Sequence, residues 1–167
     1  MAREYIIPAS ALTVAATACT LVGIQCGTAA GTTVALEFLR AYCGQAANAT
    51  SAQSRIQLHT QLTSFPTVLS QAPVAIKATD PVSKITGNTT TAAGTCGNNA
   101  SGEGTGAKTV ILPDSFNVLN GWLWVPTPAE TIIESTSGTA RSFGMMFPAA
   151  PSPTTAWSFG LVFREIG

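Results

Sequence analysis

One segment alternates apolar and polar residues over eight positions: Arg55-Ile56-Gln57-Leu58-His59-Thr60-Gln61-Leu62. Successive side chains of a β-strand point to opposite faces, so this period of two predicts a strand with one buried face. We expect the even-numbered residues, from Ile56 to Leu62, to face a core. The odd-numbered residues, His59 among them, should then face outward.

The same period recurs along the chain. The residues Trp157, Phe159, Leu161 and Phe163 would share one face of a second strand, and residues 34–42 read as a strand that is buried on much of both faces. Gly, Pro, Asn and Ser separate further predicted strands at 10–15, 20–26, 74–77, 109–112, 121–125, 130–134 and 142–147. Many short strands with almost no helix predict an all-β fold, a single-domain antiparallel β-sandwich that is jelly-roll-like.

The length of 167 residues fits one such domain. We expect residues 1–12 to form an N-terminal arm or a first edge strand, and residues 13–167 to form the β-sandwich domain. An arm is favoured because Arg3, Tyr5, Ile6 and Ile7 would be poorly placed in an isolated domain. A Gly-, Asn- and Thr-rich stretch predicts a long loop at about 86–108, of the kind that is often functional.

Charge is scarce in this chain. Charged residues make up 10% of it, against about 25% in ordinary domains, and 8 basic residues balance 8 acidic ones. This balance argues against direct nucleic-acid binding and against a polybasic membrane-surface protein. The apolar runs are too short for a membrane span, and the start lacks a signal-peptide core, so we expect synthesis in the cytoplasm. A surface of Thr, Ser, Asn and Ala favours packing against partners, because few charges need desolvation.

The search for a catalytic or metal-binding set finds little. His59 is the one histidine, and its place on the polar side of a strand favours a surface role. A glycan hydrolase would need two carboxylates, but none of the candidates lies in a distinctive context: Glu37, Asp80, Glu103, Asp114, Glu130 and Glu134. We therefore predict a non-enzyme without catalytic residues, cofactor or metal. The cysteine spacing matches no common zinc pattern and favours free, buried thiols at Cys19, Cys26, Cys43 and Cys96.

Two features point to protein contacts instead. Trp122 and Trp124 are two residues apart and share one sheet face, which could be core, subunit interface or ligand platform. Glu37 and Arg40 lie within a largely apolar strand and Arg55 opens the next, so each needs a partner if buried, either within the chain or from a neighbouring subunit. The candidate interface residues are Arg3, Tyr5, Ile6, Ile7, Glu37, Arg40, Arg55, Trp122 and Trp124.

Three parts of the chain together resemble small virion proteins of tailed bacteriophages: residues 37–58, residues 116–130 and residues 157–167. Some of these proteins are capsid cement (decoration) proteins. The resemblance implies a homotrimer with a jelly-roll-type sandwich that binds the major capsid protein on the outer capsid surface of the virion and stabilises the shell. It supplies no catalytic residues. The alternative is a phage receptor-binding or glycan-binding head domain, suggested by the Trp pair and the long loop.

Overall fold

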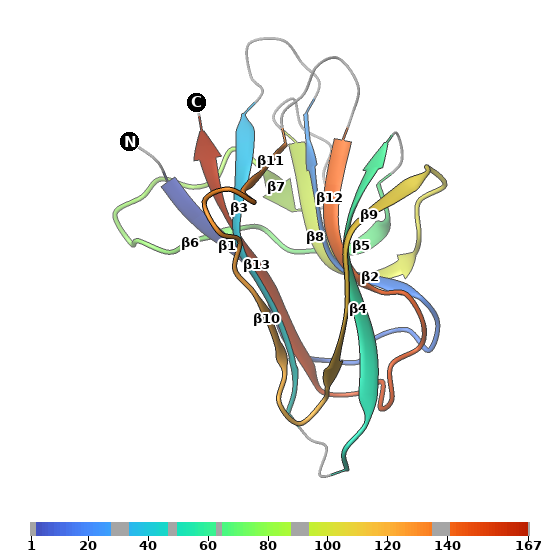
Figure 1. Ribbon diagram of the computed structural model, residues 1–167. Coiled ribbons are helices and arrows are strands. Elements are labelled where there is room, and N and C mark those ends of the chain that lie inside the picture. The colour runs from blue at the N-terminus through green and yellow to red at the C-terminus, as the bar shows by residue number, and fades with distance from the viewer. Residues whose placement is uncertain are drawn as a thin grey trace.

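Two β-sheets pack face to face in the computed structural model, which describes residues 3–27, 34–46, 50–62, 65–87, 94–134 and 141–166 (Figure 1). These residues contain no helix. Their strands are β1 (Arg3–Leu12), β2 (Cys19–Cys26), β3 (Ala35–Gln45), β4 (Gln53–Leu62), β5 (Thr67–Ser70), β6 (Val74–Ala75), β7 (Thr86–Gly87), β8 (Gly94–Gly102), β9 (Lys108–Asn117), β10 (Trp122–Trp124), β11 (Ile132–Glu134), β12 (Arg141–Phe147) and β13 (Trp157–Ile166). The predicted all-β sandwich is confirmed.

The six-stranded sheet has the order β10-β3-β13-β1-β6, and β11 also pairs with β3. The seven-stranded sheet has the order β5-β8-β2-β12-β4-β9, and β7 pairs with β8. The β7–β8 pair is parallel and the other pairs are antiparallel. The principal pairs are nested in the chain, because β4 pairs with β9, β3 with β10, β2 with β12 and β1 with β13. The chain thus resembles one long hairpin that has been rolled into two layers.

The alternating segments build the core as expected. The apolar side chains of β13 at Trp157, Phe159, Leu161 and Phe163 are completely buried between the sheets. Opposite them, Ile56 and Leu58 of β4 are buried too. Aromatic contacts across the interior include the stacked rings of Phe38 and Phe143, with centroids 4.0 Å apart, and the edge contact of Phe147 with Trp157 at 4.9 Å. Each such side chain contributes roughly 1.5–3 kcal/mol through its removal from water.

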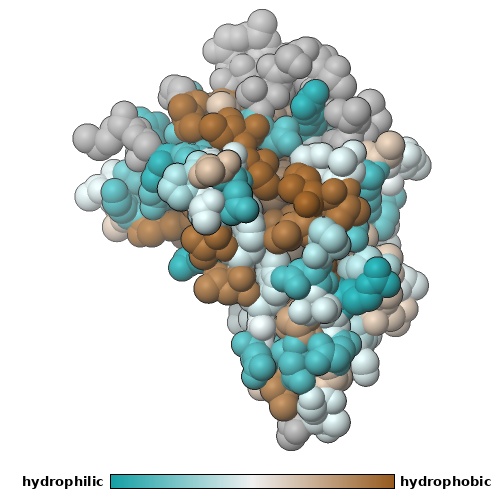
Figure 2. All heavy atoms as spheres, viewed as in Figure 1, coloured by the Kyte–Doolittle hydropathy of each residue, from teal (hydrophilic) through white to brown (hydrophobic). Residues whose placement is uncertain are grey.

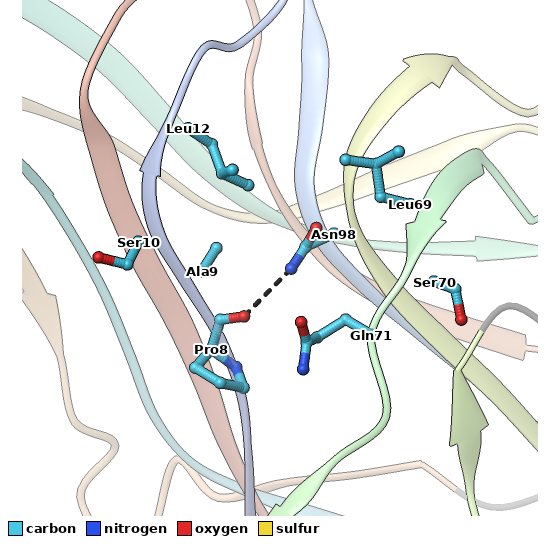
Figure 3. A pocket seen from close by; sticks show the side chains of 8 residues that line it. All are labelled: Pro8, Ala9, Ser10, Leu12, Leu69, Ser70, Gln71 and Asn98. Atoms are coloured by element: carbon cyan, nitrogen blue, oxygen red, sulfur yellow. Dashed lines mark hydrogen bonds between the residues drawn. The ribbon is translucent and has the colours of Figure 1, made fainter.

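Residues 3–12, the described part of the segment predicted to be an N-terminal arm or a first edge strand, form strand β1. Strand β1 pairs with β13 from Arg3 to Leu12, and β6 pairs with its Tyr5 and Ile6. The physical reason is again a period of two, since Tyr5 and Ile7 bury their side chains in the core. Beyond this point β1 borders the other sheet, where Asn98 Nδ2 of β8 donates a hydrogen bond to the Pro8 carbonyl at 3.1 Å (Figure 3).

The predicted loop at about 86–108 is wrong for its middle part. Residues 94–102 form β8, which lies beside β2 inside the seven-stranded sheet. Turn-forming residues hide this strand from sequence patterns, but tight packing explains them. A Cβ at Gly97 would lie 2.4 Å from Val68 Cγ2 of β5, the neighbouring strand of the same sheet, so a larger residue does not fit there. Residues 88–93 lie outside the described part of the chain.

Candidate interaction surface

A groove of about 320 Å³ lies where the two sheets present neighbouring edges. One edge is β9 of the seven-stranded sheet, and the other is formed by β10 and β11 of the six-stranded sheet (Figure 1). The lining residues are Ile111, Leu112, Trp124, Val125, Glu130 and Ile132. Five of these six side chains are apolar, so the groove is suited to apolar groups of a partner.

A β-bulge shapes the first wall. In the β4–β9 pairing, Leu58 lies opposite Leu112 and His59 lies opposite Val110, which leaves Ile111 as an extra residue. Bulges bend a strand and redirect side chains. Here Ile111 and Leu112 follow one another in the chain and both line the groove. The bulge therefore gives this wall two large aliphatic side chains where regular alternation would supply one.

The second wall is built by two short strands that lie along β3. Residues Trp122–Trp124 pair with residues 41–43, and residues Ile132–Glu134 pair with residues 36–38. The Trp124 ring is half-buried and lies 6.4 Å from the Phe143 ring, centroid to centroid. Trp122 is part of the core, whereas Trp124 packs against the core with part of its surface and also lines the groove.

Trp122 also connects the two edges. It is 8% exposed, and its Nε1 donates a hydrogen bond to Asp114 Oδ2 of β9 at 2.8 Å. Because the indole is buried and its N–H is satisfied, Trp122 is not free to stack on a sugar ring. This bond fixes the spacing of β9 and β10 at one end of the gap between the sheets.

Exposed aliphatic residues occur on or next to each of the three strands that border the groove. Figure 2 shows hydrophobic residues gathered on this face of the molecule. We call the following set the edge band: Leu123 with 63% exposure, Val125 with 59%, Ile133 with 55%, Val110 with 44% and Ile111 with 41%. Isolated exposed aliphatic residues are normal, but several of them on neighbouring edge strands, two of which line a groove, indicate an interaction site.

The charged candidates have an internal arrangement. Arg164 of β13 donates from Nη1 to Glu37 Oε2 at 3.0 Å and from Nη2 to Glu4 Oε1 at 2.8 Å. Glu37 thus has a partner within the chain, the simpler of the two alternatives. Arg40 is exposed with its guanidinium carbon 6.0 Å from the centroid of the Tyr42 ring, and Arg55 is exposed on β4.

The nine candidate interface residues therefore divide by burial. Tyr5, Ile7 and Trp122 are buried within the chain, which leaves their side chains little surface for a partner. Arg3, Ile6, Glu37, Arg40, Arg55 and Trp124 are at least partly exposed, and their role at an interface stays a prediction. The edge band was missed because Leu123 and Val125 share the parity opposite to the Trp pair, and attention to aromatic residues favoured the wrong face.

His59 is also placed differently from the prediction. It is buried on the outer side of the seven-stranded sheet, near Gly144, where an added Cβ would lie 2.9 Å from the imidazole Cε1. Burial, together with the charge of Lys108, lowers the pKa of His59 to about 4. Its Nδ1 has no hydrogen-bond partner among the described residues. The glycine below His59 makes room for the ring, which explains how an outward-facing histidine is buried.

The segment that joins β8 to β9 covers this area. Glu103 accepts hydrogen bonds from the Thr20 amide at 2.5 Å and the Thr20 hydroxyl at 2.7 Å, and it also forms an ion pair with Lys108. Burial opposes the charge of Glu103, but the contacts with Lys108 and Thr20 prevail and lower its pKa. The carboxylate of Glu103 is therefore fully engaged in these contacts, which hold the segment against β2 and β9.

Two of the carboxylates considered for hydrolysis hold local structure. Glu130 Oε2 accepts hydrogen bonds from the Thr127 hydroxyl at 2.8 Å and the Thr127 amide at 3.4 Å. Asp114 accepts from Trp122 and, through Oδ1, from the Ser115 amide at 2.7 Å. Both residues are exposed and lie beside the groove or its end. Two carboxylates, each oriented by hydrogen bonds, therefore lie at the border of the groove.

The cysteines are buried thiols, as expected. Burial raises the pKa of Cys19 to about 11 and those of Cys26 and Cys96 to about 12, and it also raises the pKa of Cys43. Thiols with such pKa values stay protonated and unreactive at neutral pH. Across the described ranges, no group of three or more His, Cys, Asp or Glu side chains could hold a metal ion.

A second groove of about 410 Å³ lies between β1 and β5. Figure 3 shows Asn98 and Gln71 between these strands, and the Asn98–Pro8 hydrogen bond crosses the space. This groove is lined by amides and hydroxyls as well as by Leu12 and Leu69. Four of its eight lining residues are polar, against one of six in the groove between β9, β10 and β11, which we call the β9–β10–β11 groove.

Comparisons with family models, with curated proteins and with solved structures gave no match. The part of the chain that the structure describes has no helix whose length and hydropathy would suit a membrane crossing. Functional inference therefore rests on the surface itself.

Proposed function

We propose that this chain is a structural virion protein, a capsid cement protein that binds the outside of a phage shell as a homotrimer. The observation that carries the proposal is the edge band with its groove, an apolar surface on a chain in which charged residues make up 10%. The partners would be other copies of the chain and the major capsid protein.

The strand order supports an assembly role. We infer that β1-β13-β3-β10 and β2-β12-β4-β9 are the two four-stranded layers of a jelly roll, with β5 to β8 inserted between the fourth and fifth strands. Jelly rolls occur in viral capsid proteins and in lectins. A fold alone does not determine function, so the choice between these classes depends on the exposed surface.

The exposed surface favours protein contacts over sugar contacts. A glycan-binding head would be expected to present aromatic rings for stacking, but Trp122 is buried and Trp124 is half-buried. The edge band presents Leu, Ile and Val instead. Burying these side chains against another protein removes apolar area from water at roughly 25 cal/mol per Å², and few charges lose hydration.

This surface suggests how the chain would stabilise a shell. Apolar contacts between copies would hold a trimer together, and the trimer would bridge several capsid subunits. Each added contact would oppose separation of those subunits under internal pressure. Because the same contacts repeat around the particle, a modest energy per copy would have a large total effect.

The solution mass and the position in the particle test this proposal. We expect the purified chain to sediment at three times its monomer mass, and a Leu123→Asp, Ile133→Asp variant to sediment as a folded monomer. Leu69→Asp, which places the same charge at an exposed leucine of β5, is the matched control and should leave the trimer intact. Circular dichroism would verify that each variant is folded.

Electron microscopy of particles from virus-producing cultures that contain the chain would locate it. Density for the chain on the outer shell supports the proposal. A wild-type chain that stays monomeric and is absent from the shell would contradict it.

A further inference from the structure

The loop between β6 and β7 presents an unusually exposed apolar side chain. Val82 is 89% exposed, more than any other large hydrophobic residue that the structure describes. It follows Pro81 and is flanked in the loop by the exposed Lys77 and Lys84. We call residues 77–84 the Val82 loop.

Buried groups hold the Val82 loop on both sides of the valine. Before it, the Tyr5 hydroxyl donates a hydrogen bond to the Pro81 carbonyl at 3.0 Å. After it, the Ser83 hydroxyl and the Lys84 amide donate to the same Glu165 oxygen, at 2.5 Å and 3.0 Å. Tyr5 is completely buried and Glu165 is 6% exposed, so both anchors belong to the domain interior.

The hydrogen bonds on both sides of Val82 are stronger evidence for a contact role than its exposure alone. A single apolar residue at the surface is ordinary. Here, however, a core tyrosine and a buried carboxylate fix the backbone on either side of it, and the Ser83 hydroxyl also accepts the Ile85 amide at 3.1 Å. A side chain presented by an ordered loop loses little conformational entropy on binding, which favours a contact role.

The β9–β10–β11 groove has the complementary chemistry. Its walls are apolar, and its volume of about 320 Å³ is ample for a valine side chain with its neighbouring backbone. Its exposed acidic residues, Glu130 on the lining and Asp114 at the end of the gap, are oriented by hydrogen bonds. The Val82 loop carries the opposite charge at Lys77 and Lys84, with Asp80 half-buried between them.

We propose that the Val82 loop of one copy inserts Val82 into the β9–β10–β11 groove of a second copy, with Lys84 facing Glu130. The proposal rests on the self-association in the proposed function and names the contact that produces it. The loop and the groove are different surfaces, so the interface is heterologous and joins copies head to tail. Such contacts close into a ring when the rotation between copies fits, and a rotation of one third of a turn gives the trimer.

Disulfide cross-linking tests the contact directly. The double variant Val82→Cys, Val125→Cys places one thiol on the loop and one in the groove, and the four native thiols are buried. We expect mild oxidation to give dimers and trimers in non-reducing gels. The control Val82→Cys, Leu69→Cys should stay uncross-linked, as should each single variant. Cross-linking of Val82→Cys alone would show a symmetric contact and overturn the proposal.

Charge exchange supplies an independent measurement. Val82→Asp should weaken self-association by about 30-fold, as the loss of a central apolar contact does. Lys84→Glu and Glu130→Lys should each weaken it by about threefold, as for an exposed ion pair, and the double variant should recover most of the loss. Additive losses in the double variant would contradict the Lys84–Glu130 contact.

The two proposals fail in distinguishable ways. If the wild-type trimer survives Val82→Asp but dissociates in Leu123→Asp, Ile133→Asp, the edge band forms the interface and the Val82 loop does not. If the wild-type chain is monomeric, the proposed self-association fails and the loop contact fails with it.

Discussion

Strands β9 and β13 have the same length of ten residues but opposite surroundings. Strand β13 lies between β3 and β1, and seven of its ten residues are buried. Strand β9 is the last strand of its sheet, and one of its ten residues is buried. The hydrophobic side chains of β13 therefore stabilise the domain, whereas Val110 and Ile111 of β9 remain available to a partner. A strand's place in the sheet decides which of these uses its apolar residues serve.

The edge strand is protected against indiscriminate pairing. Pro113 removes one backbone donor, and the bulge at Ile111 interrupts the regular ladder. Both devices discourage the addition of another strand. The aliphatic residues remain exposed nonetheless, so β9 is adapted to side-chain contacts in a groove more than to continuous strand addition.

Truncation of one residue in each strand gives the largest difference. Phe163→Ala in β13 should lower the free energy of unfolding by about 3–5 kcal/mol, because it leaves a cavity in the core. Ile111→Ala in β9 should lower it by less than about 1 kcal/mol, since the side chain keeps much of its contact with water. Urea unfolding followed by tryptophan fluorescence measures both. Similar losses would mean that β9 contributes to the core as β13 does.

Acidification tests the contribution of the buried His59 in β4, the strand next to β9, to the stability of the domain. The pKa of His59 is about 4 in the folded chain, and that of an unfolded histidine is near 6.5. Between these values the unfolded chain binds more protons, so the free energy of unfolding falls as the pH drops from about 6.5 to about 4. At 1.36 kcal/mol per pKa unit the total loss approaches about 3 kcal/mol.

Urea unfolding at pH 7, 5.5 and 4.5 would measure this loss. His59→Gln removes the titrating group and should flatten the dependence in that window, although carboxylates still lower stability at more acidic pH. An identical slope in His59→Gln would assign the effect to other groups.

The smallest effect concerns β13 itself, on its outer face. Arg164→Met removes the ion pairs with Glu4 and Glu37, which are partly exposed. Salt screens such pairs, and each contributes about 0.2–1 kcal/mol. The expected loss at low salt is therefore about 1 kcal/mol, far below that of Phe163→Ala on the same strand. Thermal unfolding at two salt concentrations would measure it, and a loss as large as that of Phe163→Ala would contradict the contrast between the two faces.

The sequence predicted the parts of the fold in which local pattern and tertiary burial agree. The alternation at 157–163 identified β13 and its core face, and the alternation at Ile56 and Leu58 identified β4. It failed at 94–102, where glycines and asparagines form an internal strand because a neighbouring segment packs closely on Gly97. It failed again at His59, whose burial depends on Gly144 in another strand.

The candidate site was accessible to sequence analysis only in part. The sequence analysis singled out Trp122, Trp124 and the segment around them, but the edge band lies on the other residues of that segment, on β9 and on β11. Nothing local to Val110 and Ile111 distinguishes them from core residues. Their exposure follows from the position of β9 at the end of its sheet.

By itself, the sequence determined that this chain is an all-β domain with a large apolar core and a surface poor in charge, because side-chain period and composition are local properties. The tertiary structure decided which strands are internal and which are edges. It also decided that a bulge directs the Ile111 side chain towards a groove, and that hydrogen bonds from Tyr5 and to Glu165 hold the loop that exposes Val82. These features depend on pairings between residues far apart in the chain, such as Tyr5 with Pro81 and Glu165 with Ser83. A single local pattern carries no record of such partners.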